Sequence, residues 1–271
     1  NWSGAMIDFN TRAERMGWLP SAPQLESNPL DVGRKIVESG ADPNSFIPEA
    51  LKSGDLKLAC HDPDAPQNWP RNMFFWRSNV LGASGKGHEY FLKHLLGTHT
   101  SLRAEETASE LRPRDVRWRD DAPEGKLDML LALDFRMTSS TLLADVVLPS
   151  ATWYEKYDLS STDMHPYVHA FTPAIDPPWE TRSDFEAFTA IARRVSELGG
   201  THLGVRRDLV ATALQHDTPG ETAQPLGVVR DWRTGDTEPV PGRTMPTFTV
   251  VERGNGALAD KKGSHGPRTQ R

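Results

Sequence analysis

Cysteine is nearly absent from this sequence, since Cys60 is the only one among 271 residues. One thiol excludes a disulfide framework, a four-cysteine zinc site and any iron–sulfur cluster that this chain holds alone. No apolar run approaches the about 18–20 residues that a membrane-spanning helix needs. Positive charge is not in excess either, because 31 Lys and Arg residues stand against 37 Asp and Glu residues. This balance argues against binding to nucleic acid through bulk positive charge.

Apolar and aromatic residues, by contrast, are numerous enough for a packed core. They include 8 Trp, 10 Phe and 4 Tyr residues, and the length allows one large domain or two smaller ones. The two ends have a different character. The chain opens at Asn1 without an initiator Met, and the residues after Arg253 are rich in Gly, Lys, Arg and Ser. We therefore expect a piece of a longer protein, with a processed domain and a flexible tail as the alternative.

Three short apolar runs in the middle of the chain predict buried strands. They are residues 72–78, 126–135 and 144–149. An amphipathic helix over residues 88–97 is expected between the first two. The order strand, glycine loop, helix, strand, polar loop, strand predicts a parallel α/β sheet. Because ligands bind at the carboxyl ends of such strands, the polar loops 78–87 and 134–141 are expected at the binding edge.

The remaining segments predict fewer elements. A helix is expected over residues 31–39, ended by Gly40, and a strand over 247–252. A second helix begins after Ser183, which has Glu186 three residues later as in a capping box, and glycines 199 and 200 are expected to end it. The predicted division is a flanking helical and loop segment over 1–70, an α/β dinucleotide-binding core over 71–150, its continuation over 151–250 and a disordered tail over 251–271.

The glycine loop Gly82-ASGKG has part of the chemistry of a phosphate-binding loop. It is not a P-loop, because only two residues separate Gly82 from Gly85, and Gly87 rather than Ser or Thr follows Lys86. Glycines still allow backbone amides to approach a phosphate, and the next helix begins directly after them. An ordinary helix-entry loop is the alternative interpretation.

Two acidic residues occupy informative positions beside the predicted strands. Asp134 ends a strand, where a carboxylate can accept hydrogen bonds from ribose hydroxyls or from the N–H groups of a purine. A cap for the turn from Thr138 to Thr141 explains the same position equally well. Asp145 begins the next strand and is also at a common capping position.

The histidines and the cysteine give weaker indications. His165 and His169 have the spacing of a helical metal site, but Pro166 lies between them and makes a helix improbable. Cys60 and His61 have no partner in the sequence that indicates nucleophilic catalysis. No Ser-His-Asp arrangement follows from the spacing of the remaining residues.

Longer stretches of the chain resemble a known family, the molybdopterin oxidoreductases. The run from Leu133, DFRMTSSTLLADVVLPSATWYEKYDLSSTDMHPYVH, is similar to their strand, Ser/Thr-rich turn, ADVVLP segment and downstream Glu. Within the family, the fuller resemblance is to the catalytic alpha subunits of respiratory nitrate reductases. It extends to the segments that begin at Asp8, Trp76, Asp176 and Ala223, and so covers residues 5–253 almost continuously.

The resemblance implies roles for individual residues around a bis-molybdopterin guanine dinucleotide cofactor that holds molybdenum. The cofactor-binding residues that it implies are Ser78, Asn79, Ser84, Lys86, Gly87, Asp134, Arg136, Thr138, Ser139 and Ser140. Asp163 and His165 match a segment near the pterin and the substrate channel. The molybdenum ligand and the ligands of the family's 4Fe-4S cluster are expected outside this chain, so no metal-binding residue is expected within it.

The resemblance also implies a function and partners. We expect part of a subunit that reduces nitrate to nitrite with two electrons, in a complex with an iron–sulfur beta subunit and a membrane-bound cytochrome b gamma subunit. That complex would lie at the cytoplasmic face of the membrane, and nucleic acid is not an expected partner. The chain alone is expected to be inactive. The alternatives are a nucleotide-binding α/β module, a non-functional remnant, and a nitrite-oxidising or other oxyanion-reducing relative.

Overall fold

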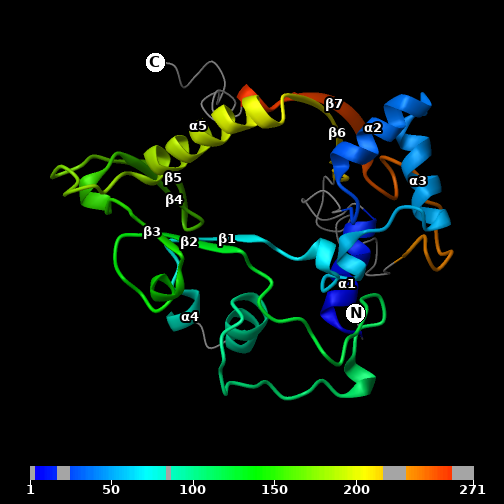
Figure 1. Ribbon diagram of the computed structural model, residues 1–271, viewed down its shortest axis with the longest axis horizontal. Helices are drawn as coiled ribbons and strands as arrows, with labels where there is room; N and C mark the ends of the chain where they lie inside the picture. Colours follow the sequence, from blue (N-terminus) through cyan, green and yellow to red (C-terminus); the bar gives the residue numbers. More distant parts are fainter. Residues whose placement is uncertain (1–3, 17–24, 84–86, 216–229, 258–271) are drawn as a thin grey trace. The chain divides into compact units, whose positions relative to one another are not determined.

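The computed structural model describes residues 4–16, 25–83, 87–215 and 230–257, which fold into two compact units (Figure 1). Unit 1 comprises residues 1–69, 105–122 and 205–253, and unit 2 comprises residues 70–104, 123–204 and 254–271. Within the four described ranges, no helix is long and apolar enough to cross a lipid bilayer. The division into four consecutive segments stays a prediction.

Unit 1 contains a group of helices and a two-stranded sheet. The elements are α1 (Met6–Arg15), α2 (Pro29–Ser39), α3 (Pro43–Ser53), β6 (Val205–Thr212) and β7 (Thr247–Gly254). The predicted helix over 31–39 is confirmed as α2, which Asn28 caps by accepting the Leu30 N–H at 3.0 Å. Figure 1 shows α2 beside β6, and Gly33 permits this contact because a Cβ there would lie 3.1 Å from the Arg207 carbonyl oxygen. The predicted strand over 247–252 is confirmed as β7.

The predicted parallel sheet forms the centre of unit 2. Its strands are β1 (Asn72–Trp76), β2 (Met129–Asp134) and β3 (Val146–Pro149), paired in the order β1-β2-β3. Both pairings are parallel, with Trp76 opposite Leu133 and Leu133 opposite Leu148. All three carboxyl ends therefore lie at one edge, from which the loops that follow β1 and β2 emerge.

One face of this sheet packs against the segment between β1 and β2. That segment contains α4 (Val80–Ala83) and η3 (Tyr90–Leu95), and its Leu81, Phe91, Leu92 and Leu96 pack with Phe75, Leu130 and Ala132 of the sheet. The helix predicted over 88–97 is present, with a π-helical turn in which the Leu96 N–H bonds the Phe91 carbonyl. Gly97 ends it with φ +70°.

The long helix α5 (Asp184–His202) confirms the predicted capping box, because Ser183 and Glu186 exchange hydrogen bonds at its start. The predicted end at Gly199 and Gly200 is wrong, since the helix continues to His202. A Cβ on Gly199 would lie 2.9 Å from the Asn255 carbonyl oxygen. This glycine thus allows η8 (Asn255–Ala257) to approach the helix closely rather than ending it.

Unit 2 also contains η5 (Thr141–Leu143), η6 (Trp153–Glu155) and an antiparallel hairpin of β4 (Asp158–Thr162) and β5 (His165–Phe171).

Candidate functional site at the carboxyl edge of the sheet

The loops that follow β1 and β2 are joined by hydrogen bonds between Asn79 and Ser140. Asn79 Oδ1 accepts the Ser140 backbone N–H at 3.2 Å and the Ser140 hydroxyl at 3.0 Å. Ser140 Oγ in turn accepts the Leu81 N–H at 2.9 Å, and its residue is fully buried. The structure therefore brings together two predicted site residues that lie 61 positions apart in the sequence.

Gly82 makes the close approach of these two loops possible. A Cβ at this position would lie 2.7 Å from Ser139 Oγ and closer still to Asn79 Nδ2. Ser139 itself is exposed at this junction, whereas Ser78 is partly buried directly after β1. Farther along the loop, Gly87 is exposed with φ +74°. Ser84 and Lys86 lie outside the described residues.

Asp134 occupies the carboxyl tip of the central strand and is 7% exposed. Its Oδ1 accepts the Phe135 N–H at 2.8 Å. Oδ2 has no hydrogen-bond donor among the described residues, so this oxygen is available to accept from a ligand. The alternative role as a cap for the 138–141 turn is not what the structure contains, because Thr138 and Thr141 cap each other through their hydroxyls. Asp145 does not cap a helix or turn but joins the start of β3 to β2, because its carboxylate accepts the Leu130 N–H at 2.7 Å and its own N–H donates to the Leu130 carbonyl at 2.9 Å.

Arg77, which sequence reasoning missed, belongs to the same edge. It follows β1 directly and has a left-handed backbone, with φ +53°. Its guanidinium contacts the rings of both Phe135 and Trp153, 5.5 and 5.2 Å from their centroids, and lies within 3.3 Å of Asp184. Its Nε is buried without a hydrogen-bond partner in the described part of the chain. A charged residue directly after a buried strand is the signal that singled out Asp134, and it applies equally to Arg77.

Asp184, at the first turn of α5, is the centre of a buried polar network at this edge. It accepts hydrogen bonds from Ser150, which follows β3, at 2.7 Å and from Lys156 at 2.6 Å. Burial raises the pKa of Asp184, but the hydrogen bonds from Lys156 and Ser150 and the charge of Arg77 outweigh it, so this pKa lies below its ordinary value. The network therefore ties the ends of β1 and β3 to the start of α5.

The remaining predicted residues do not join this cluster. Arg136 is exposed, with its guanidinium 4.8 Å from the centroid of the Phe135 ring. Asp163 lies in the β4–β5 turn, and His165 lies on β5, where its ring is 5.3 Å from that of His169. These two histidines share one face of a strand rather than of a helix. Across the ranges that the structure describes, no group of three or more His, Cys, Asp and Glu side chains is arranged to hold a metal ion.

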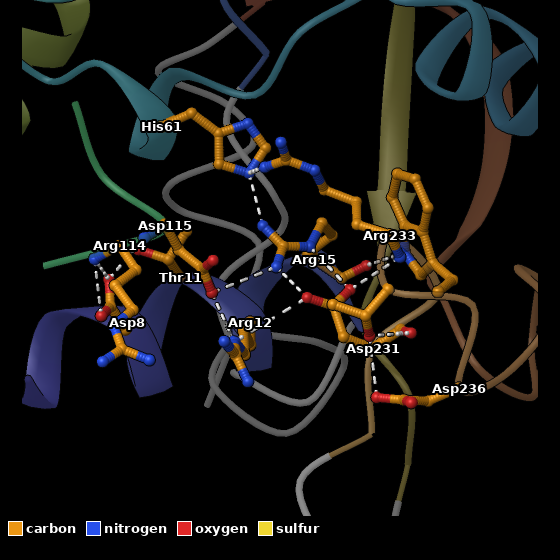
Figure 2. Close-up of polar contacts among 12 residues, drawn as sticks. Asp8, Thr11, Arg12, Arg15, His61, Arg114, Asp115, Asp231, Arg233 and Asp236 are labelled. Atoms are coloured by element: carbon orange, nitrogen blue, oxygen red, sulfur yellow. Dashed lines mark hydrogen bonds and ion pairs between the residues drawn. The ribbon is translucent and has the colours of Figure 1, made fainter. Parts of the chain in front are cut away.

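Unit 1 contains a separate cluster of buried charges around Arg15, which Figure 2 shows. The Arg15 and Asp231 side chains are 0% and 1% exposed and form a two-point ion pair through Nε and one terminal nitrogen. Arg15 also donates to His61 Nε2 at 2.6 Å. Asp8 accepts the backbone N–H groups of Arg114 and Asp115 at 2.8–3.0 Å. This network links segments that are as many as 216 residues apart, and spacing in the sequence could not have predicted it.

Burial and the charges of this cluster also change the pKa values of His61 and Cys60 in unit 1. Burial, with the charges of Arg15 and Arg233, lowers the pKa of His61 from 6.5 to about 4. Burial, with the nearby Glu14 carboxylate, raises the pKa of the Cys60 thiol to about 12. His61 is thus neutral and accepts from Arg15, and Cys60 is protonated. The Cys60 thiolate that nucleophilic catalysis requires is therefore not formed at neutral pH.

Comparison with known proteins gives one consistent result. The sequence profile of the molybdopterin oxidoreductase family matches residues 9–194. The chain is 56% identical over 261 residues to the nitrate reductase alpha subunit of Mycobacterium tuberculosis (strain ATCC 25618 / H37Rv), covering 96% of this chain and 21% of the relative. It is 50% identical over 268 residues to the respiratory nitrate reductase 2 alpha chain of Escherichia coli (strain K12), covering 98% and 21%. The perchlorate reductase subunit alpha of Dechloromonas aromatica (strain RCB) is 30% identical over 179 residues, which cover 65% of this chain and 15% of the relative. The chain thus spans about a fifth of the length of these two nitrate reductase relatives.

Proposed function

Because this chain belongs to the molybdopterin oxidoreductase family, we propose that it holds one guanine nucleotide of the molybdopterin cofactor at the carboxyl edge of the β1-β2-β3 sheet. The observation that carries the proposal is the Asn79–Ser140 junction together with Asp134, whose Oδ1 alone has a hydrogen-bond donor among the described residues. Guanine and ribose both present hydrogen-bond donors, and the free Asp134 oxygen is an acceptor that can bind them.

The polar groups at this edge suit such a ligand. Asp134 Oδ2 has no donor among the described residues, and the buried Arg77 Nε–H has no acceptor there. The buried Arg77 Nε–H without an acceptor is costly, and a bound ligand is one way to satisfy it. Asn79, Ser139 and Thr138 would add side-chain donors and acceptors from the two loops. Arg136, Ser78 and Gly87 remain candidates at the rim of the site, and Asp163 and His165 remain candidates near the pterin.

For the longer subunit, we propose the reduction of nitrate to nitrite. When bound, molybdenum in the cofactor supplies the two-electron chemistry, and the residues of this chain bind and orient the nucleotide end. The greater identity to nitrate reductase alpha subunits than to the perchlorate reductase subunit, 56% against 30%, favours nitrate over other oxyanions. The iron–sulfur beta subunit, the cytochrome b gamma subunit, the 4Fe-4S cluster and the cytoplasmic face of the membrane belong to this proposal as the setting of the longer subunit.

A nucleotide titration tests the binding site. GDP or GMP added to the purified chain should give a saturable change in Trp fluorescence, and Asp134→Ala should abolish it. Asp128→Ala is the matched control, because Asp128 precedes the amino end of the same strand, where it pairs with Arg71 and its side chain is 58% exposed. Loss of the response in both variants, or in neither, contradicts the proposed role of Asp134.

A second experiment separates the chain from the longer subunit. The chain alone should give no viologen-linked nitrate reduction. A chimera in which it replaces the matching 261-residue stretch of the Mycobacterium tuberculosis relative should bind molybdenum and reduce nitrate. Turnover by the chain alone would contradict the expectation that it is catalytically silent, and an inactive, molybdenum-free chimera would contradict the proposed function.

A further inference from the structure

The second face of the β1-β2-β3 sheet is only partly covered. The register aligns two rows of side chains on this face, Phe74–Leu131–Val146 and Trp76–Leu133–Leu148. The residues of opposite parity, such as Phe75 and Ala132, point to the other face and are buried there. On the second face, Leu131 and Leu133 of the central strand are buried, whereas the outer residues Phe74, Trp76 and Val146 are 43%, 57% and 41% exposed.

Helix α5 covers this face incompletely. Its Phe188 contacts Trp76 edge-to-face, with the ring centroids 5.2 Å apart. A cleft of about 730 Å³ nevertheless remains, with lining residues that include Leu148 of the sheet and Ala187 and Ile191 of the helix. We call this incompletely covered surface the groove. It consists of Phe74, Trp76 and Val146, which lie on this sheet face, and of the cleft lined by Leu148 and Ile191, whose walls also include the charged Glu180, Arg182 and Arg194.

Trp179 lies on the wall of the same cleft and is 96% exposed. Its backbone is left-handed, with φ +53°, a conformation that costs free energy for a residue with a side chain. An indole that is 96% exposed buries little apolar surface within this unit. Tryptophan is, however, the residue type most often found as an anchor in protein interfaces.

We propose that a helical segment of the longer alpha subunit, from outside this chain, packs into this groove with Trp179 as its anchor. Parallel sheets have both faces covered, and the covering helices come from the same polypeptide because they are the crossovers between strands. The match to the Mycobacterium tuberculosis relative covers 96% of this chain but only 21% of the relative, so about four fifths of such a subunit is available to supply the segment. This inference rests on the proposed function to the extent that it places the chain within that subunit.

The first test uses the chain by itself. The double substitution Phe74→Ser and Val146→Ser should lower the melting temperature much less than a substitution on the covered face, because the two side chains are already 43% and 41% exposed, and should lower the binding of an apolar dye such as ANS. The control substitution Phe75→Ser, on the covered face, should destabilise unit 2 strongly. Comparable destabilisation by the double substitution would show that this chain already packs the second face, and would overturn the proposal.

The second test measures burial in the longer protein. Single cysteines replace Phe74, Val146 or Trp179 in a Cys60→Ser background, and each labelling rate is divided by the rate of the same variant unfolded in urea. Labelling should be fast in the isolated chain and at least about tenfold slower in the chimera. Equal rates in both proteins refute the proposal. Protection in the isolated chain also refutes it. Sedimentation then identifies the occupant of the groove: a dimer indicates a second copy of the chain, and a monomer indicates a segment of the chain itself.

Thiol labelling reports burial and does not depend on the cofactor. A chimera that protects the groove but binds no molybdenum therefore supports this inference while the proposed function fails. A chimera that binds molybdenum while the groove stays reactive supports the proposed function and refutes this inference.

Discussion

The Asp184 carboxylate is the shared partner of the buried polar groups at the carboxyl edge. The substitution Asp184→Asn therefore tests whether these contacts stabilise unit 2. The Lys156 side chain is only 3% exposed, and Asp184 is its buried partner at 2.6 Å. The substitution Asp184→Asn leaves Lys156 with Asp158, at 2.8 Å on the exposed β4 strand, and weakens the contacts to Ser150 and Arg77. Removal of one partner of a fully buried pair costs about 3–5 kcal/mol. Because Asp158 partly compensates, we expect a loss of about 2–4 kcal/mol in the free energy of unfolding of unit 2.

The measurement must separate the two units, since each can unfold in its own transition. Urea unfolding followed by hydrogen exchange of the β2 amides gives the stability of unit 2 directly. Glu197→Gln is the matched control, because the Arg194–Glu197 pair lies in unit 2, is exposed and should contribute less than about 0.5 kcal/mol. Lys156→Met, combined with Asp184→Asn, completes a double-mutant cycle with an expected coupling of about 1–3 kcal/mol.

The pH dependence of unfolding independently tests whether the ionised Asp184 carboxylate stabilises the folded state. The pKa of Asp184 is lowered in the folded state, so its contribution is present above the unfolded value of 3.8 and is lost as pH falls through the folded value. The stability difference between wild type and Asp184→Asn should therefore be constant from pH 7 to 5 and shrink below about pH 4. A cost for Asp184→Asn no larger than that of Glu197→Gln, or an additive cycle, would refute the buried network.

Three further predictions concern other parts of the chain. Arg15→Met should cost about 3–5 kcal/mol in urea unfolding because it leaves Asp231 buried without its principal partner, and Arg15→Met with Asp231→Leu should cost less than the single change. His61, with its folded pKa of about 4 against 6.5, should make unit 1 less stable as pH falls from 6.5 to 4. The free energy of unfolding should fall by at most about 3 kcal/mol over this pH range, or by about half of that with solvent screening. His61→Gln should make the free energy of unfolding less dependent on pH. Gly82→Ala should push the Asn79 and Ser139 loops apart and weaken GDP binding about tenfold or more in the fluorescence titration. Gly254→Ala, where an added Cβ meets nothing within 4 Å, should leave binding unchanged.

The sheet was predictable from the sequence because its signals are local. Each apolar run is bounded by polar or proline-containing segments, and the intervening helix dictates a parallel connection. The carboxyl-edge position of the two loops follows from that topology alone. The end of α5 was not predictable, since Gly199 could end a helix or let another backbone approach it, and only the position of Asn255 decides between these roles.

The sequence predicted where the site lies on the sheet, but not which residues of the chain hydrogen-bond or form ion pairs with one another. Asp134 stands out because a charge at the tip of an apolar strand is locally unusual, and Arg77 has the same property. The pairing of Asn79 with Ser140 depends instead on the register of β1 against β2, which fixes how far each loop reaches. The Arg15–Asp231 pair depends on how segments 216 residues apart meet, which no local pattern encodes.

The residues at the ends of the three strands contribute differently to stability and to binding. Arg77 after β1 and Ser150 after β3 are both committed to Asp184, and so fix the first turn of α5 against the sheet. Asp134, on the strand between them, has one oxygen bonded to the Phe135 N–H and the other without a donor among the described residues. A group that retains free hydrogen-bonding capacity on a rigidly held strand is suited to a ligand, because its neighbours already hold it in place. Asp134→Ala should therefore cost less stability than Asp184→Asn while abolishing the nucleotide response, and Asp184→Asn should have the reverse balance. If both substitutions changed stability and binding in proportion, the carboxyl edge would be one undivided network and not a scaffold with a separate binding group.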